Sequence, residues 1–353
     1  MAERARDRVG HPRVAPLAPG YPGVERPMVR PLGLASVRRI GRRTATAVAV
    51  ALLLSCGGSE AADRPAVNST DRPPNPVEFD GAKAMDYVRA QLAFGARVPG
   101  TAAHRSAGDW LVREFGARAD TVLQQTWTHT TADGKRLPMR NVLARFNPTA
   151  TRRVLYVAHW DSRPRSEKAT EPSRRALPVP GANDGASGVA VLLALADVLK
   201  EAPTEIGVDL LLVDGEDWGD FDTNTDVLIG SRYFATHLPD PNYAPEFGIV
   251  WDMVGKPDAR FLYESHSVRA APDVVQRVWA TAAQIGHGQY FPTREYGAIM
   301  DDHVPLIAVG LRVIDVIDLD FDFHHTPEDT EDKVSPRTLQ VVGDVALAVI
   351  RGM

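Results

Sequence analysis

The chain lacks three features that would place it in particular protein classes. It has one cysteine, Cys56, so an intramolecular disulfide is excluded in any redox compartment. It has no excess of basic charge: a net charge of −5 and a pI near 6.1 argue against nucleic acid as a partner. Its apolar stretch at residues 45–54 is far shorter than the ~20 residues that span a bilayer. What remains is a chain of 353 residues, 44% of them hydrophobic, which is ample for a buried core.

Residues 1–55 are typical of an N-terminal extension that ends in a secretory signal peptide. Several arginines precede the apolar stretch, and a small residue and Cys56 follow it. Residues 53–56 resemble a bacterial lipobox, which implies cleavage before Cys56 and lipidation of its thiol. We therefore expect an exported bacterial lipoprotein that faces the periplasm or the cell exterior and contacts the membrane only through Cys56. An ordinary signal peptide is the alternative, and a start at Met28 would give it ordinary length.

The rest of the chain divides by composition into a linker and one catalytic domain. Residues 56–79 are rich in Pro, Asp and Ser without periodicity, which predicts a flexible linker. From residue 80 the apolar residues recur at helical spacing, and the sequence contains no internal repeat. A single catalytic domain over residues 80–353 is the simplest organisation.

Within that domain, strand-like and helix-like segments alternate. We expect strands at residues 121–130, 139–146, 153–158, 208–213, 248–253 and 310–316, and later helices at 189–200, 231–238, 273–285 and 334–350. This alternation predicts an α/β fold with a central twisted, largely parallel mixed sheet and helices on both faces. Ligands of open α/β sheets gather at the carboxyl ends of strands. The sequence therefore places His159, Asp161, residues 214–217 and Asp252 on one rim of the sheet.

Two acidic motifs favour a metal site at this rim. Asp184 is the only charge in the glycine-rich loop 180–188, where it serves either as a ligand that reaches inward or as the N-cap of the next helix. Glu216 and Asp217 are adjacent after an apolar run, so their side chains point in different directions from an extended backbone. One of them can bind a metal ion while the other moves protons, as a zinc hydrolase requires. A solvated acidic turn is the structural alternative.

Histidines complete the pattern. His324 and His325 are adjacent, and only one of them is expected to face a given site. Thr326 and the acids behind it alternatively begin a helix. His159 is either a hydrogen-bonded core residue or a ligand, and Asp161 is placed to orient it.

In this order the motifs resemble the superfamily of zinc-dependent aminopeptidases and glutaminyl-peptide cyclotransferases. The cyclotransferase branch is the closer match, on segments 97–101, 141–164, 230–232, 251–255 and 301–305. The resemblance covers about residues 80–350, and the Asp-Asp-His-x-Pro segment at 301–305 discriminates best.

The resemblance implies a role for each matching residue. Zinc would be bound by Asp184, Asp217 and His325, with Glu216 as general acid and base. Asp252 and Asp301 would hold the substrate amine and relay its proton. His159 matches the residue that binds the second ion in two-zinc aminopeptidases. Alternatively, it orients the metal ligands without contacting an ion. The chain departs from the animal cyclotransferases in having Asp217 in place of Glu, and His324 in place of Trp. Trp160, Trp218 and Trp251 are the candidates for the missing aromatic surface.

The resemblance implies cyclisation of N-terminal glutamine to pyroglutamate, with release of ammonia. The substrates would be peptide or protein N-termini, and one zinc ion would suffice. A zinc aminopeptidase of the same fold, with two zinc ions, is the alternative. A non-catalytic binding domain on a membrane anchor is a third hypothesis.

Overall fold

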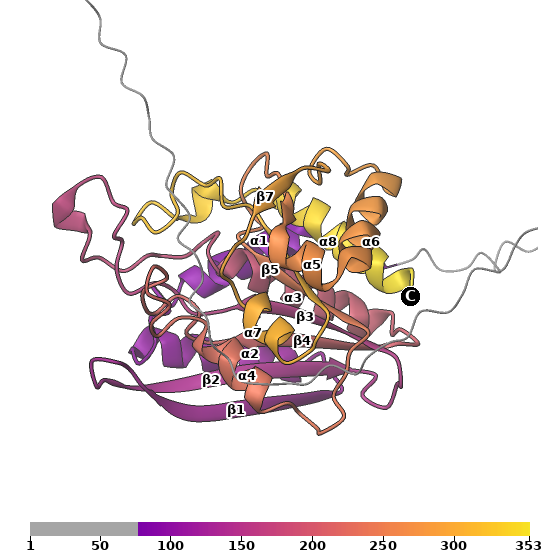
Figure 1. The fold of residues 1–353 in the computed structure, drawn as a ribbon, viewed down its shortest axis with the longest axis horizontal. Coiled ribbons are helices and arrows are strands. Elements are labelled where there is room, and N and C mark those ends of the chain that lie inside the picture. Colours follow the sequence, from indigo (N-terminus) through magenta and orange to yellow (C-terminus); the bar gives the residue numbers. More distant parts are fainter. Residues whose placement is uncertain (1–76) are drawn as a thin grey trace, which may run out of the picture. The chain divides into compact units, whose positions relative to one another are not determined.

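A computed structural model describes residues 77–353 of the chain (Figure 1). The expected signal peptide, the lipobox and most of the expected linker lie outside these residues. Phe79, next to the expected start of the domain, is already buried in the core, where it packs against Gly343. Within residues 77–353, no helix has both the length and the apolar character needed to cross a membrane.

The fold opens with two helices and a hairpin of long strands. Their bounds are α1 (Gly81–Leu92), α2 (Ala102–Gly116), β1 (Thr121–Thr130) and β2 (Arg136–Phe146). α1 begins where Asp80 caps it, because the carboxylate accepts hydrogen bonds from the amides of Ala82 and Lys83. Ala84, Tyr87 and Val88 form its buried face, as their helical spacing predicts.

Strand and helix then alternate through the rest of the domain. The elements that build it are β3 (Arg153–His159), α3 (Ala186–Glu201), β4 (Gly207–Val213), α4 (Ile229–Thr236), β5 (Phe247–Asp252), α5 (Ser265–Ala270), α6 (Pro272–Gln284), α7 (His303–Ala308), β8 (Val313–Ile317) and α8 (Pro336–Arg351). A two-stranded sheet, β6 (Tyr263–Glu264) with β7 (Glu295–Gly297), and the 3₁₀ turns η1 (Pro172–Arg174) and η2 (Glu331–Lys333) complete the domain.

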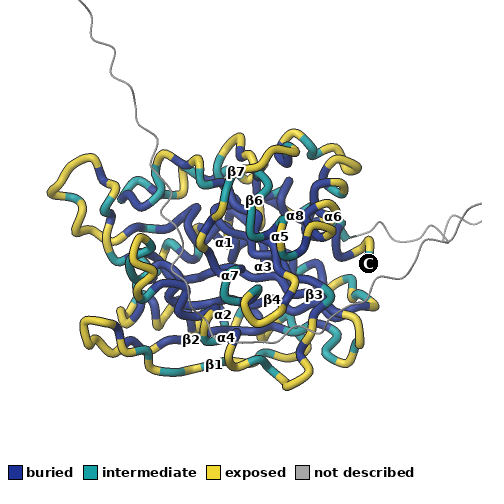
Figure 2. The backbone as a smooth tube through the Cα atoms, in the orientation of Figure 1, coloured by how far each residue is buried: buried dark blue, intermediate teal, exposed yellow. Residues whose placement is uncertain are grey.

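The six strands of the main sheet follow the order β1-β2-β4-β3-β5-β8. β1, β2 and β4 pair antiparallel, whereas β4, β3, β5 and β8 pair in parallel. The prediction of a largely parallel mixed sheet is therefore confirmed. The parallel strands are buried along their whole length, which explains their continuous apolar sequences (Figure 2).

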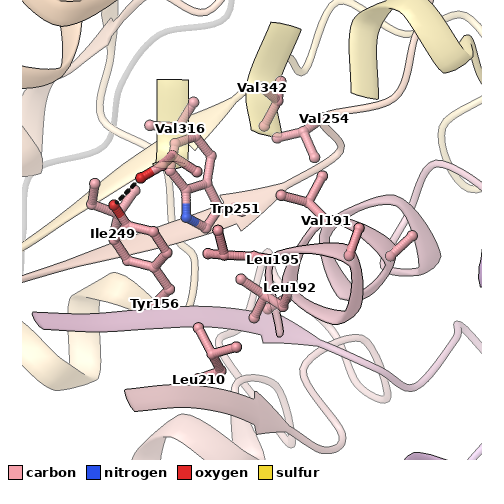
Figure 3. Close-up of a cluster of buried hydrophobic side chains, with 14 of the residues drawn as sticks. Tyr156, Val191, Leu192, Leu195, Leu210, Ile249, Trp251, Val254, Val316 and Val342 are labelled. Atoms are coloured by element: carbon pink, nitrogen blue, oxygen red, sulfur yellow. Dashed lines mark hydrogen bonds between the residues drawn. The ribbon is translucent and has the colours of Figure 1, made fainter. Parts of the chain in front are cut away.

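Two hydrophobic layers hold helices against opposite faces of this sheet. In the larger layer, Tyr156, Trp251 and Leu192 pack together with residues of α8 (Figure 3). α1, α2, α3, α6 and α8 contribute to this layer, and α4 and α7 contribute to the smaller one. Because β3 lies in the middle with both faces covered, its carboxyl end is a rigid support for side chains.

The structure shifts several expected boundaries by a few residues and corrects one. β8 begins at Val313, not at residue 310, because Gly310, with a φ of 90°, takes the left-handed conformation just after α7 ends. No α-helix starts at Thr326, whose hydroxyl donates to the carbonyl of Phe323 inside a turn. The alternative prediction that Thr326 begins a helix was therefore wrong.

Candidate active site

The expected rim exists at the carboxyl ends of β3, β4, β5 and β8. A pocket of about 580 Å³ opens there. Its lining includes Asp184, Glu216, Asp252, Asp301 and His325. These side chains come from five segments that are far apart in the sequence. The strand ends and the loops between them bring these segments together.

Asp184 occupies the centre of the site, with Oδ1 3.0 Å from His159 Nε2 and Oδ2 3.7 Å from His325 Nε2. Oδ2 also lies 3.8 Å from His324 Nε2, so both adjacent histidines face Asp184 and the expectation that only one of them would do so was wrong. Asp329 accepts hydrogen bonds from the amides of Asn183 and Asp184, which fixes the loop behind the carboxylate. Asp184 does not cap α3: the N-cap is Gly185, and no side chain caps that helix. The sequence's N-cap alternative for Asp184 was wrong.

Gly185 is required at its position by the close approach of His159. A Cβ atom there would stand 2.4 Å from the His159 carbonyl oxygen and 2.6 Å from its imidazole Cε1. Only a residue without a side chain lets the Asp184 loop come this near to the end of β3.

Glu216 and Asp217 point in different directions, as their adjacency predicted. Asp161 accepts hydrogen bonds from both of their backbone amides, at 3.1 and 3.2 Å. Asp217 turns toward His325, with 3.3 Å between Oδ1 and the imidazole Nε2, while Glu216 lines the pocket. Asp161 also lies 3.5 Å from His159 Nδ1, longer than an ordinary hydrogen bond, so it orients the acidic pair more directly than the histidine.

The donor set of Asp184, Asp217 and His325 suits a zinc ion. Two carboxylates and one imidazole are common zinc ligands, and tetrahedral bonds of 2.0–2.2 Å put ligand atoms roughly 3.4 Å apart. The distance of 3.7 Å between His325 Nε2 and Asp184 Oδ2 is close to that spacing, and the 3.3 Å between His325 Nε2 and Asp217 Oδ1 shows that the Asp217 carboxylate lies beside the same imidazole nitrogen. Asp217 Oδ2 is buried and has no hydrogen-bond partner within residues 77–353, as expected of an atom kept for a cation.

His159 belongs to a second group of possible ligands. Its Nε2 lies 3.0 Å from Asp184 Oδ1 and 3.1 Å from Asp252 Oδ1, and the ligand atoms of these three buried residues all lie within 4.8 Å of one another. The structure thus brings His159 into the site, where its Nε2 faces both Asp184 and Asp252.

Glu216 and Asp252 are buried in the pocket and hold protons readily. Burial raises the pKa of Glu216 well above its usual range, and Asp217, Asp302 and Asp301 raise it further against the opposing charge of His159. Burial and Asp301 raise the pKa of Asp252 to about 7, again against His159. A cation bound nearby would lower both values.

Asp301 lies where the resemblance put it, in the pocket wall just before α7. One of its oxygens accepts a hydrogen bond from the amide of Asp302. The other is buried without a hydrogen-bond partner in the described part of the chain.

The pocket's aromatic residues differ from the three tryptophans considered from the sequence. Trp160 and Trp251 are 1% and 0% exposed and belong to the core. Trp218 packs on the cluster of Leu137, Met139 and Ile229. Phe221 and Tyr296 line the pocket instead, together with His324.

Arg163 and Glu167 also belong to the site but were not singled out from the sequence. They form hydrogen bonds with Asp217 and His325 from a loop without periodicity. Asp214, which the sequence placed on the rim, turns away from the pocket and bonds His104 at 2.8 Å. Its position directly after β4 is the same kind of signal that correctly located Glu216.

Comparisons with known proteins place the chain in a family. Residues 141–350 match the model of peptidase family M28. The chain belongs to that family. A glutaminyl-peptide cyclotransferase-like protein of Mus musculus is 30% identical over 271 residues, covering 66% of this chain and 67% of the relative.

Two solved structures show the same fold. Porphyromonas gingivalis glutaminyl cyclase is 37% identical with a TM-score of 0.76, covering 78% of this chain and 98% of its own. A Zn-dependent exopeptidase from Parabacteroides distasonis is also 37% identical with a TM-score of 0.76, covering 79% and 100%. The predictions of the fold, of the family and of a zinc-dependent enzyme are confirmed.

Proposed function

We propose that this M28 enzyme cyclises N-terminal glutaminyl residues of peptides or proteins to pyroglutamyl residues and releases ammonia. The observation that carries the proposal is the composition of the pocket. Three buried carboxyl groups, those of Glu216, Asp252 and Asp301, line the pocket that also holds Asp184 and His325. A reaction whose nucleophile is the substrate's own amine needs such groups to bind the amine and carry its proton.

Asp184, Asp217 and His325 would hold one zinc ion, which when bound supplies Lewis acidity toward the γ-carboxamide oxygen. Glu216 takes a proton from the attacking α-amine as the new C–N bond forms at the γ-carboxamide carbon. It then gives a proton to the departing nitrogen, so that the old C–N bond breaks and ammonia leaves. Asp252 and Asp301 bind the amine and keep it in line with the carbonyl carbon.

A zinc aminopeptidase is the second candidate, and one observation favours it. His159, Asp184 and Asp252 form a second group of possible ligands that shares Asp184 with the first. If both groups held an ion, His159 and Asp252 would help to hold the second, and Glu216 would take its proton from a water molecule.

One experiment separates the two candidates. The protein is incubated with matched peptides that begin with Gln and with Leu, and the products are weighed by mass spectrometry. Loss of one ammonia from the Gln peptide supports cyclisation, whereas release of free leucine overturns it in favour of peptidase action. Zinc content, one or two ions per chain, is measured on the same sample.

We also propose that the protein is exported and anchored through a lipid on Cys56. The support is the sequence of residues 45–56 alone. Expression in a bacterial host with a Cys56→Ser variant tests it. The wild type should fractionate with membranes and the variant should not; equal fractionation of both would overturn the anchor.

A further inference from the structure

Four side chains form a closed ring at the edge of the candidate zinc site. Arg163 donates from NH1 to Asp217 Oδ1 at 2.8 Å and from Nε to both oxygens of Glu167 at 2.8 Å. Glu167 Oε1 lies 2.7 Å from His325 Nδ1. His325 Nε2 closes the ring at 3.3 Å from Asp217 Oδ1. Two members are the proposed ligands, and the other two come from the loop that follows β3.

Glu167 determines which nitrogen of His325 is free. A carboxylate at 2.7 Å keeps the proton on Nδ1, so the lone pair of the neutral ring is on Nε2, the atom that faces Asp184 and Asp217. A carboxylate behind a metal-binding imidazole also fixes the ring plane and makes the nitrogen a stronger donor.

Arg163 determines which oxygen of Asp217 is free. Its NH1 group also donates to the Asp217 backbone carbonyl at 3.0 Å, so the residue is held at two points. Oδ1 is thereby occupied, and Oδ2 is the buried oxygen without a partner in the described chain. Aspartate is one methylene shorter than glutamate, and here the Arg163 guanidinium holds its carboxylate from behind.

The surroundings enclose three of the four side chains of this ring, while the Glu167 side chain is 36% exposed. The side chains of Arg163, Asp217 and His325 are 4%, 2% and 7% exposed. Phe221 covers them: its ring centre lies 5.7 Å from the Arg163 guanidinium carbon and 6.5 Å from the centre of the His325 ring. The loop is tied to the histidine by its backbone as well, since the amide of Lys168 donates to the His325 carbonyl.

We propose that Arg163 and Glu167 are positioning residues that present Asp217 Oδ2 and His325 Nε2 to the zinc ion. The inference rests on the proposed metal set and explains how a chain with Asp217 in place of Glu completes it. It assigns to these residues no contact with substrate.

The test measures zinc affinity of the purified chain by competition with a chromogenic chelator. We expect Glu167→Gln to weaken zinc binding by about 10- to 100-fold, because the amide no longer accepts hydrogen bonds on both oxygens from Arg163 while bonding His325. Glu171→Gln is the matched control: it removes the same charge from an exposed position four residues further along the same loop. Its zinc affinity should equal that of the wild type.

The melting temperature of each metal-free protein shows whether the variant folds. A folded Glu167→Gln protein with wild-type zinc affinity overturns the proposal. If that variant does not fold, Arg163→Lys decides the matter, since it keeps the positive charge but cannot hold Asp217 and Glu167 together. It should bind zinc about tenfold more weakly, and unchanged binding overturns the inference.

Two further variants and one substrate test the proposed function separately from the positioning role. Asp217→Asn and His325→Ala test the metal set itself by loss of zinc, and the Gln peptide tests cyclisation. Weaker zinc binding in Glu167→Gln with no cyclisation by the wild type would leave the positioning role standing and remove the proposed reaction.

Discussion

At the scale of single residues, the site depends on pairs of neighbours with divided tasks. Glu216 and Asp217 are adjacent in the sequence, yet one lines the pocket and the other faces His325. Asp161 stabilises this division by accepting hydrogen bonds from both amides. Because the two side chains have different tasks, a mutation of Glu216 should affect proton transfer, and a mutation of Asp217 should affect zinc binding.

Glu216→Gln tests the proton carrier. The amide has the same shape but cannot exchange a proton, so turnover of a Gln-initiated peptide should fall by about 10²–10⁴-fold, the usual contribution of general acid–base catalysis. Zinc content should stay at the wild-type value. An inactive variant that has also lost its zinc would show that Glu216 is a ligand.

At the scale of elements, the loops after the strands bring the ligands within reach, and two features fix these loops. The first is Gly185, where the Asp184 loop passes His159 without room for a side chain. The second is Glu264, whose carboxylate caps α5 by accepting from the amides of His266 and Ser267. The same carboxylate accepts from the amide of Ile299 and bonds His303, so it ties the pocket wall to α5 and α7.

Gly185→Ala should destabilise the fold by about 1–3 kcal/mol, because the added methyl group overlaps the backbone and ring of His159. Urea denaturation measures the free energy of unfolding, and chelator competition measures zinc binding, which should weaken as well. Gly116→Ala is the control: it lies at the end of α2 with no atom within 4 Å of an added Cβ. Equal stability of the two variants would contradict the steric argument.

Glu264 makes a contribution to stability that depends on pH. Burial opposes its ionisation, but bonds from His303 and two amides outweigh burial and lower the pKa from 4.5 to about 2. The folded pKa is below the unfolded one, so the contribution is complete above about pH 4.5 and is lost as pH falls toward 2.

The comparison with Glu264→Gln isolates this effect. The difference in free energy of unfolding between wild type and variant should shrink by on the order of 2 kcal/mol between about pH 6 and pH 3. Denaturant titrations at the two pH values measure it. A difference that stays constant with pH would show that Glu264 has an ordinary pKa.

At the scale of the whole molecule, the proposed zinc ion joins segments that are distant in sequence. Asp184 precedes α3, Asp217 follows β4, and His325 lies in the loop between β8 and α8. An ion bound by all three stabilises the folded state, since the unfolded chain does not hold these groups together.

Zinc removal should therefore lower the melting temperature of the protein. At a free zinc concentration of about 100 times the dissociation constant, the folded state gains about 2.7 kcal/mol. Thermal unfolding with increasing zinc measures this gain, and magnesium, which prefers oxygen ligands, should not reproduce it. A melting temperature that does not respond to zinc would argue against the site.

Local patterns in the sequence were sufficient for the architecture and for most of the site. Continuous apolar runs predicted the buried parallel strands, because a strand covered on both faces has no polar side. Acidic and histidine residues directly after those runs predicted the rim, because parallel strands end at the same edge. His159, Asp252 and the Glu216–Asp217 pair were found in this way. Asp184 was a candidate from its glycine-rich loop, and the resemblance to the cyclotransferases selected His325 over His324.

Only the tertiary structure decided which side chains meet. Asp214 and Glu216 follow the same strand, yet Asp214 bonds His104 while Glu216 reaches the pocket. Trp160 and Trp251 are buried in the core, Trp218 packs partly buried on another hydrophobic cluster, and Phe221 lines the pocket from a loop. Arg163 and Glu167 lie in an irregular loop, where no periodicity shows the direction of a side chain. The order of residues determines which segments reach the rim, but the contacts across segments depend on how the loops pack, and that information is not local.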